Sequence, residues 1–132
     1  MTKFKSARFT SVCLIAVGAI SIAIPTNAKE RSPVYPKQLL GTWEMGYEPC
    51  KAPGNPDSDG RILIEERVHF GYEDSSTPVR ILQISRSPLA WKISSLLDID
   101  GYVSTQHEIY VLSGTHLTIV GTESSNIYTR CD

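Results

Sequence analysis

From Leu39 onward, hydrophobic residues alternate with polar or small residues in short runs. Trp43 and Met45 show this alternation in the first run, and Ile62 and Ile64 show it in the second. A period of two residues indicates a β-strand that buries one face and exposes the other. Turn-forming clusters, such as that at 74–76, separate the runs. Further strands are expected at 68–72, 79–85, 102–112, 117–121 and 127–131. Seven or eight short strands at this spacing predict an all-β fold, a small antiparallel barrel or sandwich.

The segment around Trp91 admits two interpretations. Leu89, Trp91 and Ile93 alternate as in a strand, whereas Leu89, Ile93 and Leu97 fit one face of a helix that Gly101 would end. We favour the strand because the neighbouring segments are expected to be strands, and the helix stays open as the alternative.

The first 28 residues have the three parts of a secretory signal peptide. Lys3, Lys5 and Arg8 form a basic start, an apolar run covers residues 12–24, and small residues lead to a cleavage site after Ala28. About 13 apolar residues would span only ~20 Å as a helix, which is short of the ~30 Å hydrocarbon core of a membrane. We therefore predict cleavage, no transmembrane anchor afterwards, and a periplasmic or secreted protein.

Cleavage would change both the length and the charge of the chain. Removing 28 of 132 residues leaves 104, which we divide into a flexible, polar tail over 29–38 and a barrel domain over 39–132. The 13 basic residues fall to 10 while all 14 acidic ones remain, so the formal charge moves from -1 to -4. That balance excludes the strongly basic surface of a typical nucleic-acid-binding protein.

Two of the three cysteines, Cys50 and Cys131, lie beyond the predicted cleavage site. An even pair of cysteines in an exported chain indicates one disulfide bond. The two residues are 81 positions apart, and closing a loop of that size is worth roughly 4 kcal/mol in the chain-entropy description. We expect this bond to supply a large share of the domain's stability.

The ends of the expected barrel carry a family resemblance. Gly41-Thr42-Trp43 opens the first strand and Tyr128-Thr129-Arg130-Cys131 closes the last. This pair of motifs resembles the lipocalin-like (calycin) β-barrels, and small exported bacterial proteins with the same opening and ending. The resemblance implies a barrel closed at one end by packing of Trp43 against Arg130, a cation–π contact. The chain also loosely resembles small-barrel bacterial protease inhibitors.

One loop has spacing typical of a calcium site. Asn55, Asp57, Asp59 and Glu66 occupy the ligand positions of an EF-hand loop, in which hard oxygen ligands surround Ca²⁺. The prolines and glycine at 53–56 are incompatible with the entering helix of that motif. We therefore favour a plain loop between strands, with calcium binding as the alternative.

Catalytic and other metal signatures are weak. His69, His107 and His116 do not have the spacing of a zinc site. We favour surface or packing roles for these histidines, with a meeting of His107 and His116 across a hairpin at 113–114 as the alternative. The sequence contains no Gly-x-Ser-x-Gly turn and no phosphate-binding glycine loop. We expect a protein that is not an enzyme and that needs no cofactor.

These observations favour an exported binding protein whose partner is another protein. A body of about 90 residues leaves little room for a ligand cavity, so the function is expected to lie on the surface. A periplasmic inhibitor or immunity-type protein that docks a hydrolase or toxin fits this description, with the tail over 29–38 inserted into the partner's cleft. A net acidic surface would suit a basic partner. The alternative is a lipocalin-like carrier of a small apolar ligand, which requires an enclosed apolar cavity.

Overall fold

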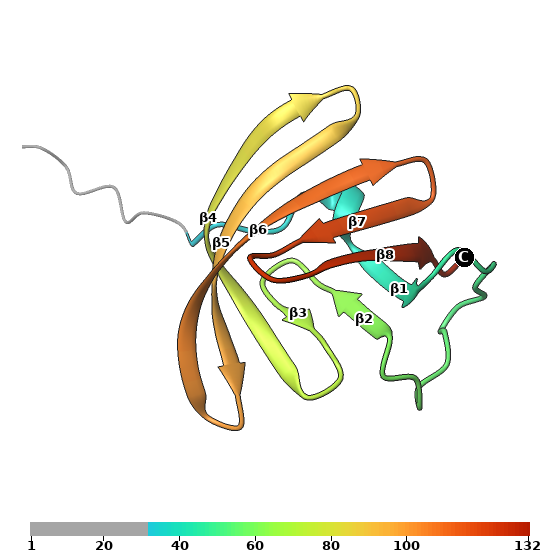
Figure 1. Cartoon of the computed structure of the whole chain (residues 1–132), viewed down its shortest axis with the longest axis horizontal. Coiled ribbons are helices and arrows are strands. Elements are labelled where there is room, and N and C mark those ends of the chain that lie inside the picture. The colour runs from blue at the N-terminus through green and yellow to red at the C-terminus, as the bar shows by residue number, and fades with distance from the viewer. Residues whose placement is uncertain (1–31) are drawn as a thin grey trace, which may run out of the picture.

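The computed structural model of the protein describes residues 32–132. Eight strands form a closed antiparallel barrel, in which each strand pairs with the next and β1 pairs with β8 (Figure 1). The strands are β1 (Gly41–Met45), β2 (Arg61–Ile64), β3 (His69–Phe70), β4 (Asp74–Arg86), β5 (Leu89–Ile99), β6 (Tyr102–Ser113), β7 (His116–Val120) and β8 (Ser125–Arg130), after the short 3-10 helix η1 (Lys37–Leu39). The predicted all-β barrel is confirmed, and the predicted signal peptide lies outside the described residues.

The segment around Trp91 is a strand, as favoured over the helix. It forms β5, which pairs along its whole length with β6. Asp74 and Ser76, which were expected in a turn, instead begin β4 opposite Ile99 and Leu97. The turn instead covers residues 71–74, where the amide of Gly71 donates to the carbonyl of Asp74 at 3.0 Å. Pairing with β5 therefore overrides the turn propensity of this segment.

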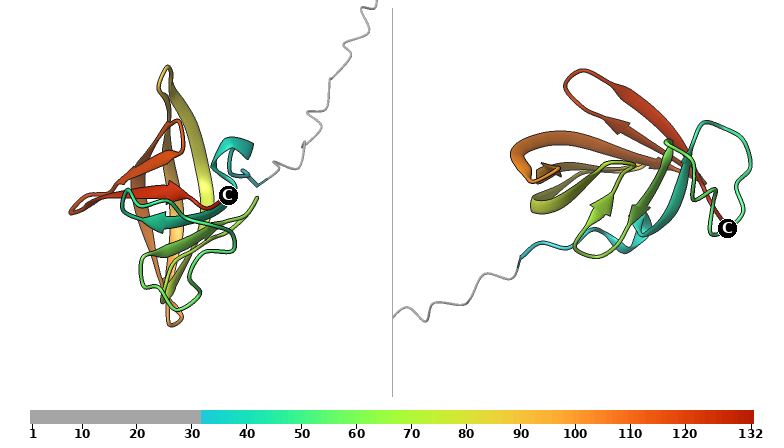
Figure 2. Two further views of the ribbon diagram at one scale, coloured as in Figure 1. Left: turned by 90° about the vertical axis from the view of Figure 1, so that its right-hand side faces the viewer. Right: turned by 90° about the horizontal axis from the view of Figure 1, so that it is seen from below.

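β4 is much longer than the strand expected over 79–85, whereas β6 ends only one residue beyond the expected 102–112. β4, β5 and β6 have 13, 11 and 12 residues, whereas β3 has two. The β4–β5 and β5–β6 hairpins consequently project beyond the ring in opposite directions (Figures 1 and 2). The β4–β5 pairing shifts register between Pro78 and Arg80 and between Gln83 and Ser85, which marks two bulges. Such bulges increase local twist and bend the projecting hairpin.

The apolar core fills the middle of the barrel. Trp91, Ile93 and Tyr110 face inward from β5 and β6 and are buried. Leu117 and Ile119 of β7 alternate with half-buried Thr118, as the period-two pattern predicts. Burying an aliphatic or aromatic side chain of this size is worth about 1.5–3 kcal/mol, so each residue of this layer stabilises the fold by an amount of that order.

One end of the barrel is closed by Trp43 and Arg130. The guanidinium carbon of Arg130 lies 4.1 Å from the centre of the indole ring, in the contact implied by the lipocalin resemblance. Arg130 also donates to the carbonyls of Leu40, at 2.9 Å, and of Gln38. A Cβ atom at Gly41 would lie 3.3 Å from this guanidinium, and the backbone φ there is +128°, so glycine suits the position on both counts.

The prediction of a flexible tail over 29–38 is wrong for the last residues of that range. Tyr35 is only 2% exposed, and its amide donates to the carbonyl of Glu66 at 2.7 Å. Its ring lies 6.5 Å from that of His69 and 6.3 Å from that of Tyr110, measured between centroids. Leu39 is fully buried and its carbonyl accepts from the indole of Trp43. The two apolar side chains anchor this segment, although its composition is mainly polar; residues 29–31 lie outside the described residues.

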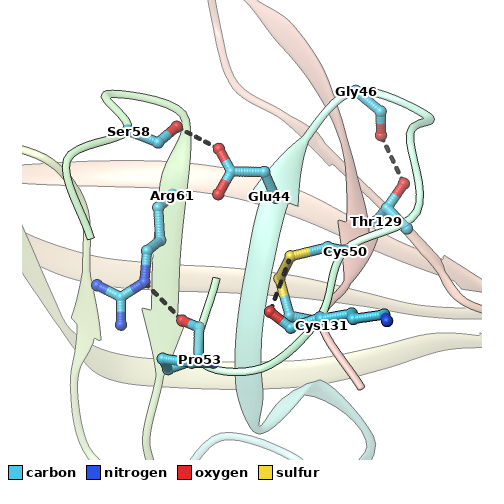
Figure 3. Close-up of a disulfide and its surroundings, with 9 residues drawn as sticks. Glu44, Gly46, Cys50, Pro53, Ser58, Arg61, Thr129 and Cys131 are labelled. Carbon is cyan, nitrogen blue, oxygen red and sulfur yellow. Dashed lines mark hydrogen bonds between the residues drawn. A yellow bond between two sulfur atoms is a disulfide. The ribbon is translucent and has the colours of Figure 1, made fainter. Parts of the chain in front are cut away.

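The predicted disulfide joins Cys50 of the β1–β2 connection to Cys131 (Figure 3). Backbone hydrogen bonds reinforce it, from Ala52 to the carbonyl of Asp132 at 3.0 Å and from Asp132 to the carbonyl of Cys50 at 3.3 Å. The side chain of Arg61 donates to the carbonyl of Pro53 and holds the same connection against β2. A long, proline-rich loop is thereby fixed to the barrel.

Candidate functional site

A cavity of about 250 Å³ opens at the end of the barrel away from Trp43. In a barrel whose strands alternate in direction, alternate connections share an end, so the β1–β2, β3–β4 and β7–β8 connections all border this opening. Asp59, Asp74 and Glu108 bring three carboxyl groups to its lining. Within residues 32–132, no Lys or Arg lines the cavity. Its chemistry is therefore polar and acidic.

The polar lining arises because β6 places polar side chains on its inner face, where a strand of a barrel usually places apolar ones. Gln106 and Glu108 lie on the same face of the strand as buried Tyr110, while His107 and Ile109 lie on the outer face. The strand is longer than the apolar layer, so its inner face leaves that layer and lines the open end. Polar residues therefore occupy inward positions on this part of the strand.

A chain of hydrogen bonds connects the cavity to the core. Nδ1 of His69 lies 2.9 Å from the hydroxyl of Tyr110, which donates to the carboxylate of Glu108 at 3.1 Å. Since the Tyr110 proton is directed to Glu108, Nδ1 of His69 is the donor to Tyr110 and Nε2 is left as an acceptor. The amide of Gln106 donates to the Ser76 hydroxyl at 2.8 Å and approaches Glu108 at 3.3 Å.

Burial shifts the ionisation of these groups. Desolvation raises the pKa of Glu108, with a further increase from the charge of Asp74 and a partial decrease from the Tyr110 hydrogen bond. Desolvation also raises the pKa of Asp74. The pKa of His69 falls to about 4 because burial disfavours its charged form, so the imidazole is neutral at pH 7. Burial likewise raises the pKa of Tyr128, and nearby Glu108 adds to the increase.

A second hollow lies on the outer face of β4, β5 and β6. Its volume is about 250 Å³, and it is lined by Arg80, Leu82, Lys92, Ser94 and His107. The strand register explains the grouping, since Arg80, Ser94 and His107 form one row across the sheet and Leu82 lies opposite Lys92 in the next. Nδ1 of His107 and the hydroxyl of Ser94 are 2.9 Å apart. Two cationic side chains therefore flank this groove, which we call the outer groove.

The outer groove continues into exposed aliphatic surface. Leu82 is 51% exposed, and the row that begins with it continues through Lys92 to Ile109 and Val120, which are also exposed. Val79 and Ile84, at the two register shifts of β4, are exposed as well.

The proposed calcium ligands are not gathered around one point. The side chain of Asn55 accepts from the amide of Asp57 at 3.1 Å, an arrangement that stabilises a turn. Asp59 lines the polar cavity, while Glu66 lies in the β2–β3 connection beside Tyr35. Across residues 32–132, no group of three or more His, Cys, Asp or Glu side chains is arranged to hold a metal ion. Asn55, Asp57 and Asp59 lie in the connection between β1 and β2.

His107 and His116 do not meet across the β6–β7 hairpin. The β6–β7 register places His116 opposite Ser113, next to the turn, whereas His107 lies beyond Ile109, the last β6 residue paired with β7. His116 instead packs against Tyr47, with ring centroids 5.5 Å apart.

Sequence reasoning missed the polar cavity. His69 was considered only as a zinc ligand or as a surface or packing residue, and Glu108 and Gln106 were not considered at all. The sequence does contain one indication of this cavity. Residues 104, 106 and 108 are polar and, in a strand, lie on the same face as Tyr110, while the opposite face is partly apolar. The face that turns inward at the open end cannot be chosen from that strand alone, since both faces mix polar and apolar side chains.

In the part of the chain that is described, no helix is long and apolar enough to cross a membrane. Comparisons with family models, with curated protein sequences and with solved structures gave no match for this chain.

Proposed function

We propose that this chain is a non-enzymatic, exported binding protein that docks another protein through the outer face of β4, β5 and β6. The observation that carries the proposal is the outer groove, together with the exposed aliphatic row that extends from Leu82. Apolar patches with a polar or charged rim are typical of protein-binding surfaces. Four of the groove residues lie on β4 and β5, whose hairpin projects beyond the ring of strands (Figure 1).

The charge of the groove defines the partner segment. The expected overall charge of -4 favours a basic partner, but Arg80 and Lys92 make the groove itself locally cationic. The contact therefore suits a segment that combines an aliphatic side chain with a carboxylate. In this proposal the protein is a periplasmic inhibitor or immunity-type protein and the partner is a hydrolase or toxin. Tyr35 is buried in the barrel, so the segment around it is not free to insert into a partner's cleft.

A lipocalin-like ancestry belongs to the same proposal. The closed eight-stranded barrel and the packing of Trp43 against Arg130 support it. The alternative function, a carrier of an apolar ligand, has less support. An apolar ligand in the open end would further desolvate the carboxyl groups of Glu108 and Asp74, whose ionised forms burial already disfavours, and this is costly.

Photocrosslinking tests the docking surface. A photoreactive amino acid replaces Leu82, and a second variant carries it at Val103, which is 54% exposed on the β5–β6 hairpin. The Leu82 position is expected to give a defined crosslink in the producing cells, and Val103 is expected to give none.

The partner identified in this way must form a 1:1 complex with the purified protein. Leu82→Asp is expected to weaken that complex at least tenfold, while Val103→Asp leaves it unchanged. Equal effects of the two substitutions would rule out this face. If the partner is a hydrolase, inhibition of its activity should be lost in parallel with binding; unaltered hydrolase activity in the intact complex would exclude the inhibitor role.

A further inference from the structure

The polar cavity at the open end has more acceptors than donors. Glu108 and Asp74 are acceptors when ionised, and they share the cavity with His69. His69 is 9% exposed, and its Nε2 atom is buried without a hydrogen-bond partner among the described residues. The hydrogen-bond direction along His69, Tyr110 and Glu108 makes this Nε2 an acceptor. A buried acceptor without a partner costs about 1–3 kcal/mol, which a donor brought by a ligand would recover.

The charge of the lining selects the class of donor. Three carboxyl groups line the cavity, and the nearest imidazole is neutral, so an anionic ligand would be repelled. Burial raises the pKa of both Glu108 and Asp74, and Asp74 raises that of Glu108 further. These shifts express mainly the cost of burying each carboxylate, and for Glu108 also its repulsion by Asp74. A cation in the cavity would remove part of that cost.

The shape and walls of the cavity favour an organic cation. Within residues 32–132, no group of three or more His, Cys, Asp or Glu side chains is arranged to hold a metal ion, so no set of metal ligands lines the cavity. Tyr72 and Tyr128 line the cavity with aromatic rings, and Ile62 and Leu97 line it with aliphatic surface. Aromatic faces attract ammonium groups, and the aliphatic side chains match a short carbon skeleton. A volume of about 250 Å³ suits a molecule of only a few heavy atoms.

We propose that the open end of the barrel binds a small primary amine, whose ammonium group donates to His69 Nε2 and to the carboxylates of Glu108 and Asp74. An ammonium group has three N–H donors, which match these three acceptors. Hydrogen bonds between charged partners are about twice as strong as neutral ones. The site lies inside the barrel, whereas the proposed protein contact lies on the outer face, so each proposal stands or fails independently.

A titration followed by amide NMR tests this site. The purified, disulfide-bonded protein is titrated at pH 7.5 with n-butylamine hydrochloride, with n-butanol and with sodium butyrate, which share one skeleton and differ in charge. The amine is expected to give saturable shifts at residues lining the cavity. Butanol and butyrate are expected to bind at least tenfold more weakly. Equal binding of butanol and the amine would overturn the proposal, as would amine shifts confined to other surfaces.

Two charge-matched variants separate the site from general electrostatics. Glu108→Gln removes a carboxylate of the site, whereas Glu73→Gln removes an exposed carboxylate at the same end that does not line the cavity. Glu108→Gln is expected to weaken amine binding about tenfold or more, because a hydrogen bond between charged groups is lost. Glu73→Gln is expected to change it less than twofold. Equal weakening in both variants would show that the amine responds only to the net charge, and the site would be excluded.

Discussion

Arg130 and Glu108 show that the two ends of the barrel differ in how well they stabilise an ionised side chain. Arg130 at the closed end has carbonyl acceptors on the N-terminal segment and an indole ring beneath its guanidinium. Glu108 at the open end accepts from Tyr110 but has no cationic partner in the cavity lining. The first arrangement stabilises a charge in place, whereas the second leaves a carboxylate whose ionised form is disfavoured by burial.

This difference predicts a pH-dependent effect of Glu108→Gln. The pKa of Glu108 is raised in the folded state, so its contribution to stability is present below the ordinary value of 4.5 and is lost as the pH rises through the folded-state value. Glutamine keeps an oxygen that can accept from Tyr110 but cannot ionise. The variant should therefore have a higher Tm than the natural protein at pH 7.5 and a similar Tm at pH 4.

Thermal unfolding monitored by circular dichroism at the two pH values measures this effect, with Glu73→Gln as the control for net charge. The lowered pKa of His69 makes both proteins less stable as the pH falls from about 6.5 to about 4. That contribution is common to both proteins and cancels when their Tm values are compared. A Tm difference that is the same at pH 4 and pH 7.5 would contradict the assignment.

At the scale of elements, the N-terminal segment behaves as a part of the barrel. Tyr35 and Leu39 enter the core, and η1 supplies the carbonyl groups that Arg130 and Trp43 use. The segment links the β2–β3 connection, through Glu66, to the closed end of the barrel. Its contribution to stability should therefore be that of core side chains.

Tyr35→Ala is expected to lower the free energy of unfolding by about 3 kcal/mol, because truncating a buried aromatic side chain leaves a cavity. Tyr47, which is 69% exposed, provides a matched control, and Tyr47→Ala is expected to cost less than about 1 kcal/mol. Urea unfolding of both variants measures the two values. Similar losses for the two substitutions would mean that the segment is not anchored through Tyr35.

The strands were predictable where one face is uniformly apolar, and less so elsewhere. In β2 and β7 the apolar side chains lie on one face only, as Ile62 with Ile64 and Leu117 with Ile119 show. Both strands were therefore expected close to their observed positions. The projecting hairpins expose aliphatic residues on both sides, so alternation does not reveal where β4 begins or how long it is. Tyr35 is isolated among polar residues, and nothing in its local pattern indicates that it fills a place between β3 and β6. Contacts of this kind depend on the assembled barrel.

For the whole molecule, closure joins the first and last strands. Trp43 pairs with Arg130 in the β1–β8 register, and the disulfide between Cys50 and Cys131 lies beside that pairing. The bond encloses nearly the entire barrel, so it restricts the unfolded chain much more than the folded one. The most non-local contacts in the molecule are thus fixed covalently.

Replacing both Cys50 and Cys131 with serine is expected to lower the free energy of unfolding by about 4 kcal/mol. The midpoint of urea unfolding should shift accordingly. A reducing agent should move the midpoint of the natural protein to that of the variant and leave the variant unaffected. An unchanged midpoint on reduction would show that the bond does not contribute to stability.

The unequal lengths of β3 and β4 have a consequence for self-association. β3 pairs with β4 only at Ser75 and Ser76, so in the described chain the rest of β4, from Thr77 to Arg86, has a strand partner on one side alone. An open edge of this length invites another chain to add a strand. Proline, charged side chains and bulges discourage such addition, and β4 contains all three, with Pro78, the arginines at positions 80 and 86, and two register shifts. The hairpin can thus project with exposed aliphatic residues while its edge opposes edge-to-edge polymerisation, and its outer face is the surface proposed above for the partner.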